Sequence, residues 1–369
     1  MNELFKAAQD RKWMRRALTL ARLSEGHTRP NPPVGAVVVK DGRKLGEGRH
    51  LCAGCAHAEV EALNACRETV AGATLYVTLE PCCTTGRTPP CTDRIVREGI
   101  ARVVVGCRDA NGCHCGRGLE LLTKQGVEVV YGVCEDEALE LTAPFAKHIA
   151  TGYPFVTVKL AMTLDGRIAD RTGCSQWVTG EAARAEVQRM RRRADVMLAG
   201  AGTVCADNPS LLCRLPGGDK LMRVIVDAAG RTPATVQVYT DDAADRTIVA
   251  TTPETARKKA AAWSTNGAQV WTFAPDKAGR IPLKRLLKRL GAAGYLHVLC
   301  EGGGKLAGGL NDAGLVDEYG LFYAPAVMGD VRAASGVAGQ GCLLSKLPRM
   351  RFVELKRFGE DVMMRVRKA

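Results

Sequence analysis

The sequence predicts two consecutive α/β domains, and three observations support this fold class. Segments typical of buried strands alternate with segments of helical spacing, as in a sheet packed against helices. The alternation stops at the turn residues Thr151-Gly152-Tyr153-Pro154 and restarts at Phe155. In addition, 369 residues are long for one domain and comfortable for two. We therefore expect one domain over residues 1–150 and a second over residues 151–369.

The first domain begins with a helix over residues 11–23, whose apolar residues recur at helical spacing. Asn31-Pro32-Pro33 ends this helix, and Asp41-Gly42 predicts a hairpin turn. Apolar runs bounded by turn residues predict the remaining elements. They are strands at 34–39, 73–79, 102–106 and 127–131, and helices at 57–66 and 91–98.

The second domain repeats the alternation of strands and helices over about 210 residues. Its predicted strands cover 155–161, 195–199, 223–227, 247–251, 296–300 and 318–323. Its predicted helices cover 181–193, 283–290 and 305–313.

The composition is that of an ordinary globular protein, with 25% charged and 46% apolar residues. No apolar run approaches the roughly 18 residues of a membrane span, and Met1 to Arg16 lacks the apolar core of a secretory signal. We therefore expect a cytoplasmic protein that binds no membrane. In that compartment most of its 15 cysteines are reduced thiols, acting as ligands or as small buried residues.

The net charge of +13 is unevenly distributed, with +2 in residues 1–150 and +11 in residues 151–369. Two interpretations explain this basic excess equally well. One is a solvated basic surface, and the other is an electric field that concentrates phosphorylated ligands.

Two separated clusters in the first domain predict a zinc site. They are His57-Ala58-Glu59 and Pro81-Cys82, with Cys91 beyond. One histidine and two cysteines would give Zn²⁺ three protein ligands and leave a fourth position for water. Glu59 would then act as the catalytic acid and base. This combination is typical of zinc-dependent nucleobase deaminases, although eight residues separate the two cysteines here instead of two.

The predicted elements are compatible with this site. Residues two apart do not share a face of a regular helix, so His57 and Glu59 must lie where the helix begins. Cys82 follows the strand at 73–79, and Cys91 opens the next helix, whose dipole favours a thiolate.

Three other cysteine motifs compete with this assignment. Cys52 and Cys55 form a C-x-x-C motif, but it lies in a loop, and we interpret its cysteines as incidental. Cys113-His114-Cys115 also reads as a loop rather than a ligand cluster. Cys83 would ligate the metal only by a shift of register, so Cys82 is preferred.

Five motifs in order resemble one family. Asn31-Pro32-Pro33-Val34-Gly35 is followed by Gly46-Glu47-Gly48-Arg49-His50 and by His57-Ala58-Glu59. Thr78-Leu79-Glu80-Pro81-Cys82 and Gly86-Arg87-Thr88-Pro89-Pro90-Cys91 complete the series. Together they closely resemble the bifunctional deaminase–reductases of riboflavin biosynthesis, and the resemblance continues through the second half.

The resemblance implies a cytidine-deaminase-like three-layer α/β/α domain at the N-terminus. This domain would hydrolytically deaminate 2,5-diamino-6-(5-phosphoribosylamino)pyrimidin-4(3H)-one. Asn31 and His50 match positions that contact the pyrimidine, and Arg87 is placed to meet the phosphate. Thr84 departs from the family, in which many members have a histidine.

For the second half, the resemblance implies a dihydrofolate-reductase-like α/β domain that uses NADPH. The glycines after Val298–Cys300 suit a turn where backbone N–H groups approach a pyrophosphate. No G-x-G-x-x-G motif follows a first strand, which disfavours a Rossmann dehydrogenase. The implied cofactor contacts are Ala161, Trp177, Thr203, Asp207, Gly303, Gly304, Gly308 and Gly309. The implied substrate contacts are Ser175, Arg191, Leu211, Arg214 and Glu301.

Two alternatives stay open. A nucleobase or tRNA deaminase fused to an unrelated reductase would require a basic face on residues 1–150, where the balance is only +2. A nucleic-acid-binding protein would interleave aromatic with basic residues, yet aromatic residues are 5% of the chain. We therefore expect a phosphorylated pyrimidine as the partner molecule, no nucleic acid, and a homo-oligomer.

Overall fold

The computed structural model describes residues 3–85, 89–218 and 220–368. The chain divides into two compact units, unit 1 at Met1–Gly152 and unit 2 at Tyr153–Ala369. Each unit has its own hydrophobic core on both faces of its own central sheet. In the described part of the chain, no helix is both long and apolar enough to span a bilayer.

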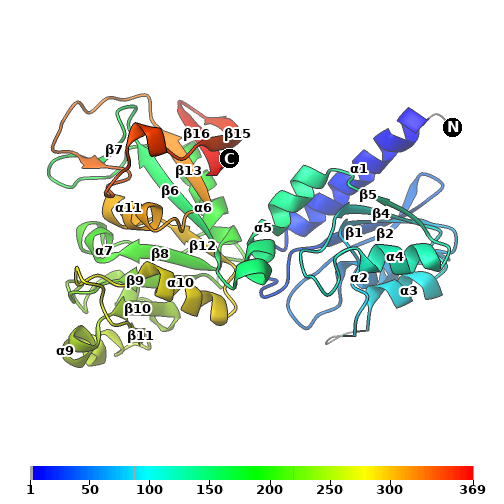
Figure 1. Ribbon diagram of the computed structural model, residues 1–369, viewed down its shortest axis with the longest axis horizontal. Helices are drawn as coiled ribbons and strands as arrows, with labels where there is room; N and C mark the ends of the chain where they lie inside the picture. The colour runs from blue at the N-terminus through cyan, green and yellow to red at the C-terminus, as the bar shows by residue number, and fades with distance from the viewer. Residues whose placement is uncertain (1–2, 86–88, 219, 369) are drawn as a thin grey trace. The chain divides into compact units, whose positions relative to one another are not determined.

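Unit 1 is built on a five-stranded sheet in the order β2-β1-β3-β4-β5 (Figure 1). The hairpin of β1 and β2 turns at Asp41-Gly42, β1 runs antiparallel to β3, and β3, β4 and β5 are parallel. The strands are β1 (Gly35–Lys40), β2 (Arg43–Arg49), β3 (Thr74–Leu79), β4 (Arg102–Cys107) and β5 (Glu128–Tyr131).

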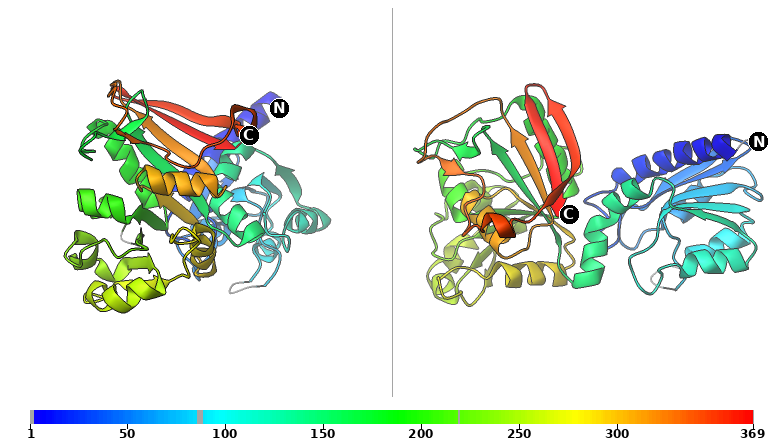
Figure 2. Two further views of the ribbon diagram at one scale, coloured as in Figure 1. Left: turned by 60° about the vertical axis from the view of Figure 1, so that its left-hand side comes forward. Right: turned by 45° about the horizontal axis from the view of Figure 1, so that its top comes forward.

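Helices cover both faces of the unit 1 sheet, as the right-hand view of Figure 2 shows. Successive β1 side chains point to opposite faces, so Val37 packs beneath one helical layer and Val38 against the other. The first layer contains α1 (Glu3–Arg22) and α5 (Glu135–Thr151); the second contains α2 (Ala58–Asn64), α3 (Cys91–Arg97) and α4 (Arg117–Lys124). This arrangement is the expected three-layer α/β/α fold.

Unit 2 contains a nine-stranded sheet in the order β11-β10-β9-β8-β12-β6-β13-β16-β15 within the described residues. Its first seven strands are parallel, and β16 and β15 complete it in antiparallel pairs. The strands are β6 (Phe155–Met162), β8 (Val196–Gly200), β9 (Met222–Val226), β10 (Thr247–Thr251), β11 (Gln269–Thr272), β12 (His297–Cys300), β13 (Glu318–Tyr323), β15 (Met350–Phe358) and β16 (Asp361–Lys368). A separate two-stranded ribbon pairs β7 (Arg167–Ala169) with β14 (Ala334–Ser335).

Helices also cover both faces of the unit 2 sheet. One core contains side chains of α6 (Glu181–Arg193), α7 (Ala201–Asp207), α8 (Gln237–Thr240) and α9 (Pro253–Trp263). The other contains side chains of α10 (Leu283–Ala292) and α11 (Gly304–Asp312). Two short 3₁₀ turns lie at Ala244–Arg246 and Leu344–Lys346. The α/β class expected for this half is therefore confirmed.

The structure departs from the sequence expectations at elements that lack a regular pattern of buried apolar residues. Helix α1 begins at Glu3 rather than near residue 11. The pattern missed its first turns because their apolar residues, such as Leu4 and Phe5, are exposed and do not continue the buried stripe. The strands β15 and β16 were not expected, since charged residues interrupt their apolar pattern. They form because β16 pairs with β13, far away in the sequence.

Candidate functional site

The three predicted metal ligands of unit 1 lie together. His57 Nδ1 is 3.5 Å from Cys82 Sγ and 3.3 Å from Cys91 Sγ. The ligand atoms of the three residues all lie within 4.8 Å of one another. Two thiols and one imidazole are donors that zinc prefers, and three protein ligands leave one tetrahedral position open. The donor set therefore fits Zn²⁺.

Each ligand lies at the end of an element, where the backbone is irregular. His57 caps α2 with an extended backbone, φ −71° and ψ 161°, so it precedes the first regular turn. Cys82 lies just beyond the carboxyl end of β3, and Cys91 is the first residue of α3. The backbone N–H of Cys91 donates to Cys82 Sγ at 3.3 Å. One strand end and two helix starts therefore converge on the site.

Glu59 lies buried beside these ligands, with 4% of its surface exposed. Burial raises the pKa of its carboxyl group to about 7, and the Cys82 thiolate adds to the rise. The pKa of Cys82 is lowered to about 4, mainly by hydrogen bonding with Cys91. A carboxyl group with a pKa near neutrality can both accept and return a proton.

His50 and Asn31 form a fixed pair next to the cluster. The His50 ring lies edge-on to the His57 ring, with centroids 5.5 Å apart. His50 Nδ1 donates to the Ala56 carbonyl oxygen at 3.0 Å, so Nε2 accepts from the Asn31 amide at 3.1 Å. Burial lowers the pKa of His50. Both residues therefore lie beside the predicted metal ligands, with the proton of the imidazole on Nδ1 and Nε2 acting as an acceptor.

Glu80 organises the loop beside the metal cluster, a role that sequence reasoning missed. Its buried carboxylate accepts three backbone N–H groups, from Asp109 at 3.2 Å and from Gly116 and Gly118 at 2.9 Å each. The only signal in the sequence is an acidic residue directly after a buried strand. Because the three donors lie far along the chain, that signal does not identify the role.

The competing motifs do not join the cluster. Residues 113–115 form a turn, as expected, and Cys113 and Cys115 are exposed. His114 Nδ1 lies 3.7 Å from Cys83 Sγ. Among the residues that the structure describes, only His57, Cys82 and Cys91 form a metal-binding group. Thr84 is exposed, and Arg87 lies outside the described residues.

Unit 2 contains a cavity of about 1820 Å³ near the carboxyl ends of its parallel strands, where α/β sheets bind ligands. Most of the predicted reductase residues line it. They are Ala161, Ser175, Trp177, Arg191, Thr203, Asp207, Leu211, Arg214, Glu301, Gly303, Gly304 and Gly309.

A buried ionic cluster lies in the wall of this cavity. Glu301 follows β12 and accepts two hydrogen bonds from Arg191 on α6, at 2.7 and 3.0 Å. Lys159 Nζ on β6 is 3.9 Å from Glu301 Oε2. Burial alone would raise the pKa of Glu301, but Arg191 and Lys159 lower it. Burial lowers the pKa of Lys159, a residue that the sequence analysis did not single out as a contact.

The glycine-rich turn after β12 forms another wall. The backbone N–H of Gly303 donates to Thr203 Oγ1 at 3.0 Å. A side chain at Gly304 would collide with the Ser335 carbonyl group. Gly308 differs from the other predicted glycines, because it is not among the residues lining the cavity. A side chain there would collide with the backbone of Ala338, so its small size serves packing.

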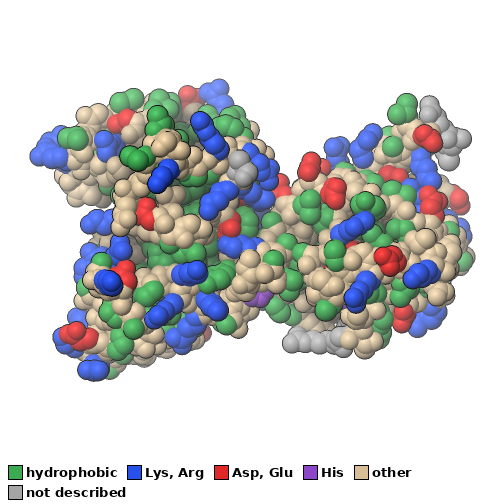
Figure 3. All heavy atoms as spheres, viewed as in Figure 1, with side chains coloured by type: hydrophobic (Ala, Val, Ile, Leu, Met, Phe, Trp, Pro, Cys, Tyr) green, Lys and Arg blue, Asp and Glu red, His purple; other side chains and the backbone are tan. Residues whose placement is uncertain are grey.

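Polar and aromatic side chains complete the cavity. Ser175 Oγ donates to the Asp207 carboxylate at 3.1 Å. Trp177 is 66% exposed, and the Arg184 guanidinium lies 4.6 Å from the centre of its ring. Eight lysines and arginines line the cavity against six acidic residues among those described. Other basic side chains are scattered over the face of unit 2 in Figure 3, so only part of the basic excess serves the cavity.

Comparisons with known proteins give matches to both halves of the chain. A family model for the cytidine and deoxycytidylate deaminase zinc-binding region matches residues 7–107, and one for the RibD C-terminal domain matches residues 154–364. The riboflavin biosynthesis protein RibD of Bacillus amyloliquefaciens is 42% identical over 352 residues, or 95% of this chain and 94% of that protein.

Two solved structures are similar over nearly their whole length. Acinetobacter baumannii RibD, form 1, has a TM-score of 0.85 and 35% identity, covering 98% of this chain and 99% of that one. A diaminohydroxyphosphoribosylaminopyrimidine deaminase/5-amino-6-(5-phosphoribosylamino)uracil reductase from Thermotoga maritima has a TM-score of 0.85 and 36% identity, covering 99% and 100%. The chain therefore belongs to the RibD family of bifunctional deaminase–reductases of riboflavin biosynthesis.

Proposed function

We propose that unit 1 deaminates 2,5-diamino-6-(5-phosphoribosylamino)pyrimidin-4(3H)-one and that unit 2 reduces the resulting 5-amino-6-(5-phosphoribosylamino)uracil with NADPH. The observation that carries this proposal is the pair of separate sites in one chain. Unit 1 joins a buried glutamate to a His/Cys/Cys cluster, and unit 2 has a large cavity with a buried ionic cluster. The Thermotoga maritima relative carries the names of the same two activities.

In unit 1, His57, Cys82 and Cys91 hold the metal and Glu59 moves the protons. Zinc bound here would supply a Lewis acid that lowers the pKa of a water molecule to about 7. The Glu59 carboxylate accepts a proton from the attacking water and delivers it to the amino group, which leaves as ammonia. Burial makes Glu59 suitable for this proton exchange, because it raises the pKa of the carboxyl group to about 7.

Asn31 and His50 hold the pyrimidine in this proposal. Since the Asn31 amide nitrogen donates to His50 Nε2, the Asn31 carbonyl oxygen is oriented as an acceptor for a substrate N–H group. The Ala56 carbonyl oxygen fixes the His50 tautomer from the other side. We retain Arg87 as the phosphate contact on the family resemblance.

In unit 2, Lys159 is proposed to donate the proton that accompanies reduction. NADPH bound in the cavity would supply the hydride. The cofactor contacts would be Ala161, Trp177, Thr203, Asp207, Gly303, Gly304 and Gly309. The substrate contacts would be Ser175, Arg191, Leu211, Arg214 and Glu301. Glu301 holds Lys159 toward the cavity, and burial eases release of the lysine proton by lowering its pKa.

Replacing Lys159 by methionine is expected to lower the kcat of reduction by roughly 10²–10⁴, the contribution of a positioned proton donor. Lys159→Arg is the matched control, because it keeps the charge but holds its proton too tightly to donate it. In the wild type, kcat should fall as pH rises through the lowered pKa of Lys159. Full activity in Lys159→Arg would show that only the charge matters.

The reductase is expected to prefer NADPH to NADH by roughly tenfold to a hundredfold. The 2′-phosphate would meet basic residues of the cavity in charge-assisted hydrogen bonds worth about 1.5–3 kcal/mol, which corresponds to that ratio. Values of kcat/KM for the two cofactors, measured side by side, test this expectation. Equal values would mean that the basic residues of the cavity serve another purpose.

Exposed apolar residues on the edge strand β15 support the expectation of a homo-oligomer, since Phe352 and Leu355 are each 67% exposed. We further propose a cytoplasmic enzyme that binds small phosphorylated molecules rather than nucleic acid.

The proposed function is tested by giving purified protein the diaminopyrimidine phosphate with NADPH. Ammonia release and NADPH oxidation are then followed separately. We expect both, with ammonia first. NADPH oxidation without ammonia release would show that the chain lacks the deaminase activity. Ammonia release without NADPH oxidation would show that it lacks the reductase activity.

A further inference from the structure

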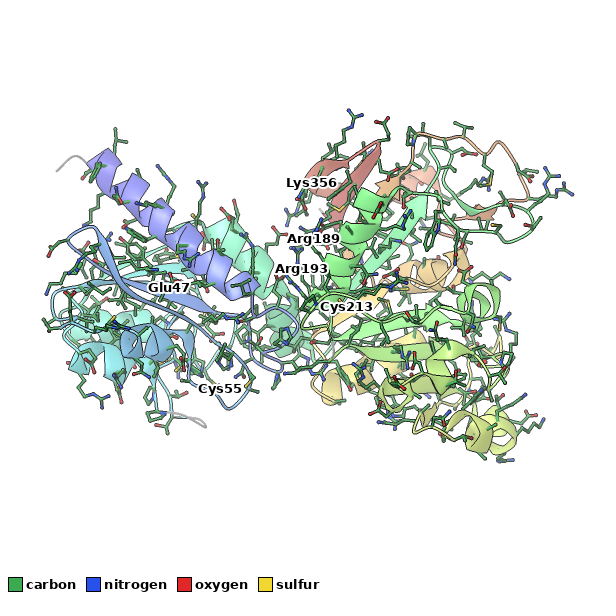
Figure 4. The ribbon with its side chains drawn as sticks, turned by 180° about the vertical axis from the view of Figure 1, so that it is seen from behind. Glu47, Cys55, Arg189, Arg193, Cys213 and Lys356 are labelled. Atoms are coloured by element: carbon green, nitrogen blue, oxygen red, sulfur yellow. The ribbon has the colours of Figure 1, made fainter. Side chains whose placement is uncertain are left out.

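The turn before α2 contains two cysteines that neither proposed reaction uses. Cys52 Sγ and Cys55 Sγ lie 2.7 Å apart. The backbone N–H of Cys55 donates to the Cys52 carbonyl oxygen at 3.0 Å, which closes a β-turn. Gly54, at φ +88°, supplies the left-handed conformation that a type II turn requires at its third position. Figure 4 marks Cys55 on this loop.

This contact changes the interpretation of the motif as two incidental cysteines. A β-turn keeps its first and last Cα atoms within about 7 Å, and disulfides span Cα separations of about 4.4–6.8 Å. Bonded sulfurs are about 2.0 Å apart, so these two need to approach by about 0.7 Å. Both side chains are half-exposed, so a small oxidant can reach them.

We propose that Cys52 and Cys55 form a reversible disulfide, and that this pair is a redox modification site of unit 1. The oxidant is a low-molecular-weight disulfide such as oxidised glutathione. One cysteine thiolate attacks this disulfide and releases one thiolate, leaving a mixed disulfide on the protein. The second cysteine attacks the mixed disulfide and releases the other thiolate. The protein sulfurs lose two electrons, and their two protons appear on the two released thiols.

The position of the pair connects it to the deaminase site. The hydrogen bond from His50 Nδ1 to the Ala56 carbonyl oxygen spans this turn, and the metal ligand His57 follows at once. Drawing the two sulfurs together shifts the backbone between these histidines. This consequence rests on the proposed function, in which His50 contacts the pyrimidine. Formation of the disulfide itself does not depend on that proposal.

The test equilibrates the zinc-loaded full chain in buffers of stepped reduced-to-oxidised glutathione ratio, followed by alkylation and tryptic peptide mass analysis. The tryptic peptide from His50 to Arg67 contains Cys52, Cys55 and Cys66. Cys66→Ser is therefore the matched control. We expect wild type and Cys66→Ser to lose two alkylation sites in one step without added mass from glutathione. Cys52→Ser and Cys55→Ser should form no internal disulfide, and any blocked cysteine in them should carry a glutathione adduct. A peptide that stays fully alkylated, or a bond that includes Cys66, would overturn the proposal.

Ammonia release and zinc content are measured on the same samples. Oxidised wild type should retain its zinc and lose about tenfold in kcat/KM, within the loss that ångström-scale misplacement causes. Cys52→Ser should be as active as reduced wild type in every buffer. Equal rates for oxidised and reduced wild type would overturn the link to the deaminase site. Absence of ammonia release from reduced wild type would instead overturn the proposed function, because the peptide analysis reports the disulfide independently.

Discussion

Cys91→Ser is expected to lose both bound zinc and deaminase activity. The wild type should hold about one zinc per chain on three protein ligands, and the substitution removes a thiolate donor. Cys91 is buried and its Sγ lies 3.3 Å from His57 Nδ1, so the substitution removes a donor from within the cluster. Elemental analysis of the purified protein and an ammonia assay provide the two readouts. Both should fall to background.

Cys66→Ser is the matched control for this substitution. Cys66 is half-buried in the same unit, and its thiol donates to the Ala62 carbonyl oxygen at 3.2 Å, a bond that a serine hydroxyl can replace. This variant should keep both zinc and activity. Full zinc in Cys91→Ser, with Cys83 or Cys52 as the replacement ligand, would contradict the assigned ligand set.

Glu59→Gln should separate metal binding from proton transfer. Glutamine has nearly the same shape and cannot accept the proton of water, so zinc stays and deamination falls by at least roughly 10²–10⁴. Burial already raises the pKa of Glu59 to about 7, so a neutral side chain is tolerated there. Zinc content and ammonia release should therefore diverge in this variant.

Glu61→Gln is the control for this second substitution. Glu61 lies two residues further along α2, is half-exposed, and is not part of the metal-binding group. Its loss should leave both readouts unchanged. Deamination at the normal rate by Glu59→Gln would show that another group moves the proton.

The metal site could be predicted from the sequence because its chemistry is local to short motifs. His57 and Glu59 are two residues apart, and Cys82 and Cys91 are nine residues apart. The ends of α2, β3 and α3 then bring them together. The sheets were predictable for a similar reason, since their strands are apolar runs such as Val103–Val105.

Roles that depend on distant contacts could not be predicted in this way. Glu80 receives its three backbone donors from residues about 30 to 40 positions away. Lys159 gains its lowered pKa only because folding buries it, an effect that outweighs the opposite effect of the nearby Glu301. Gly308 fits a phosphate-binding pattern in the sequence, yet its small size serves packing against Ala338.

The central claim is that one chain carries two reactions at two separate sites, and one assay of Glu59→Gln tests it most directly. NADPH oxidation is followed with either the diaminopyrimidine phosphate or its deaminated uracil counterpart. We predict almost no oxidation with the first and wild-type oxidation with the second, because Lys159 and the unit 2 cavity are intact. Equal impairment with both substrates would contradict two independent sites.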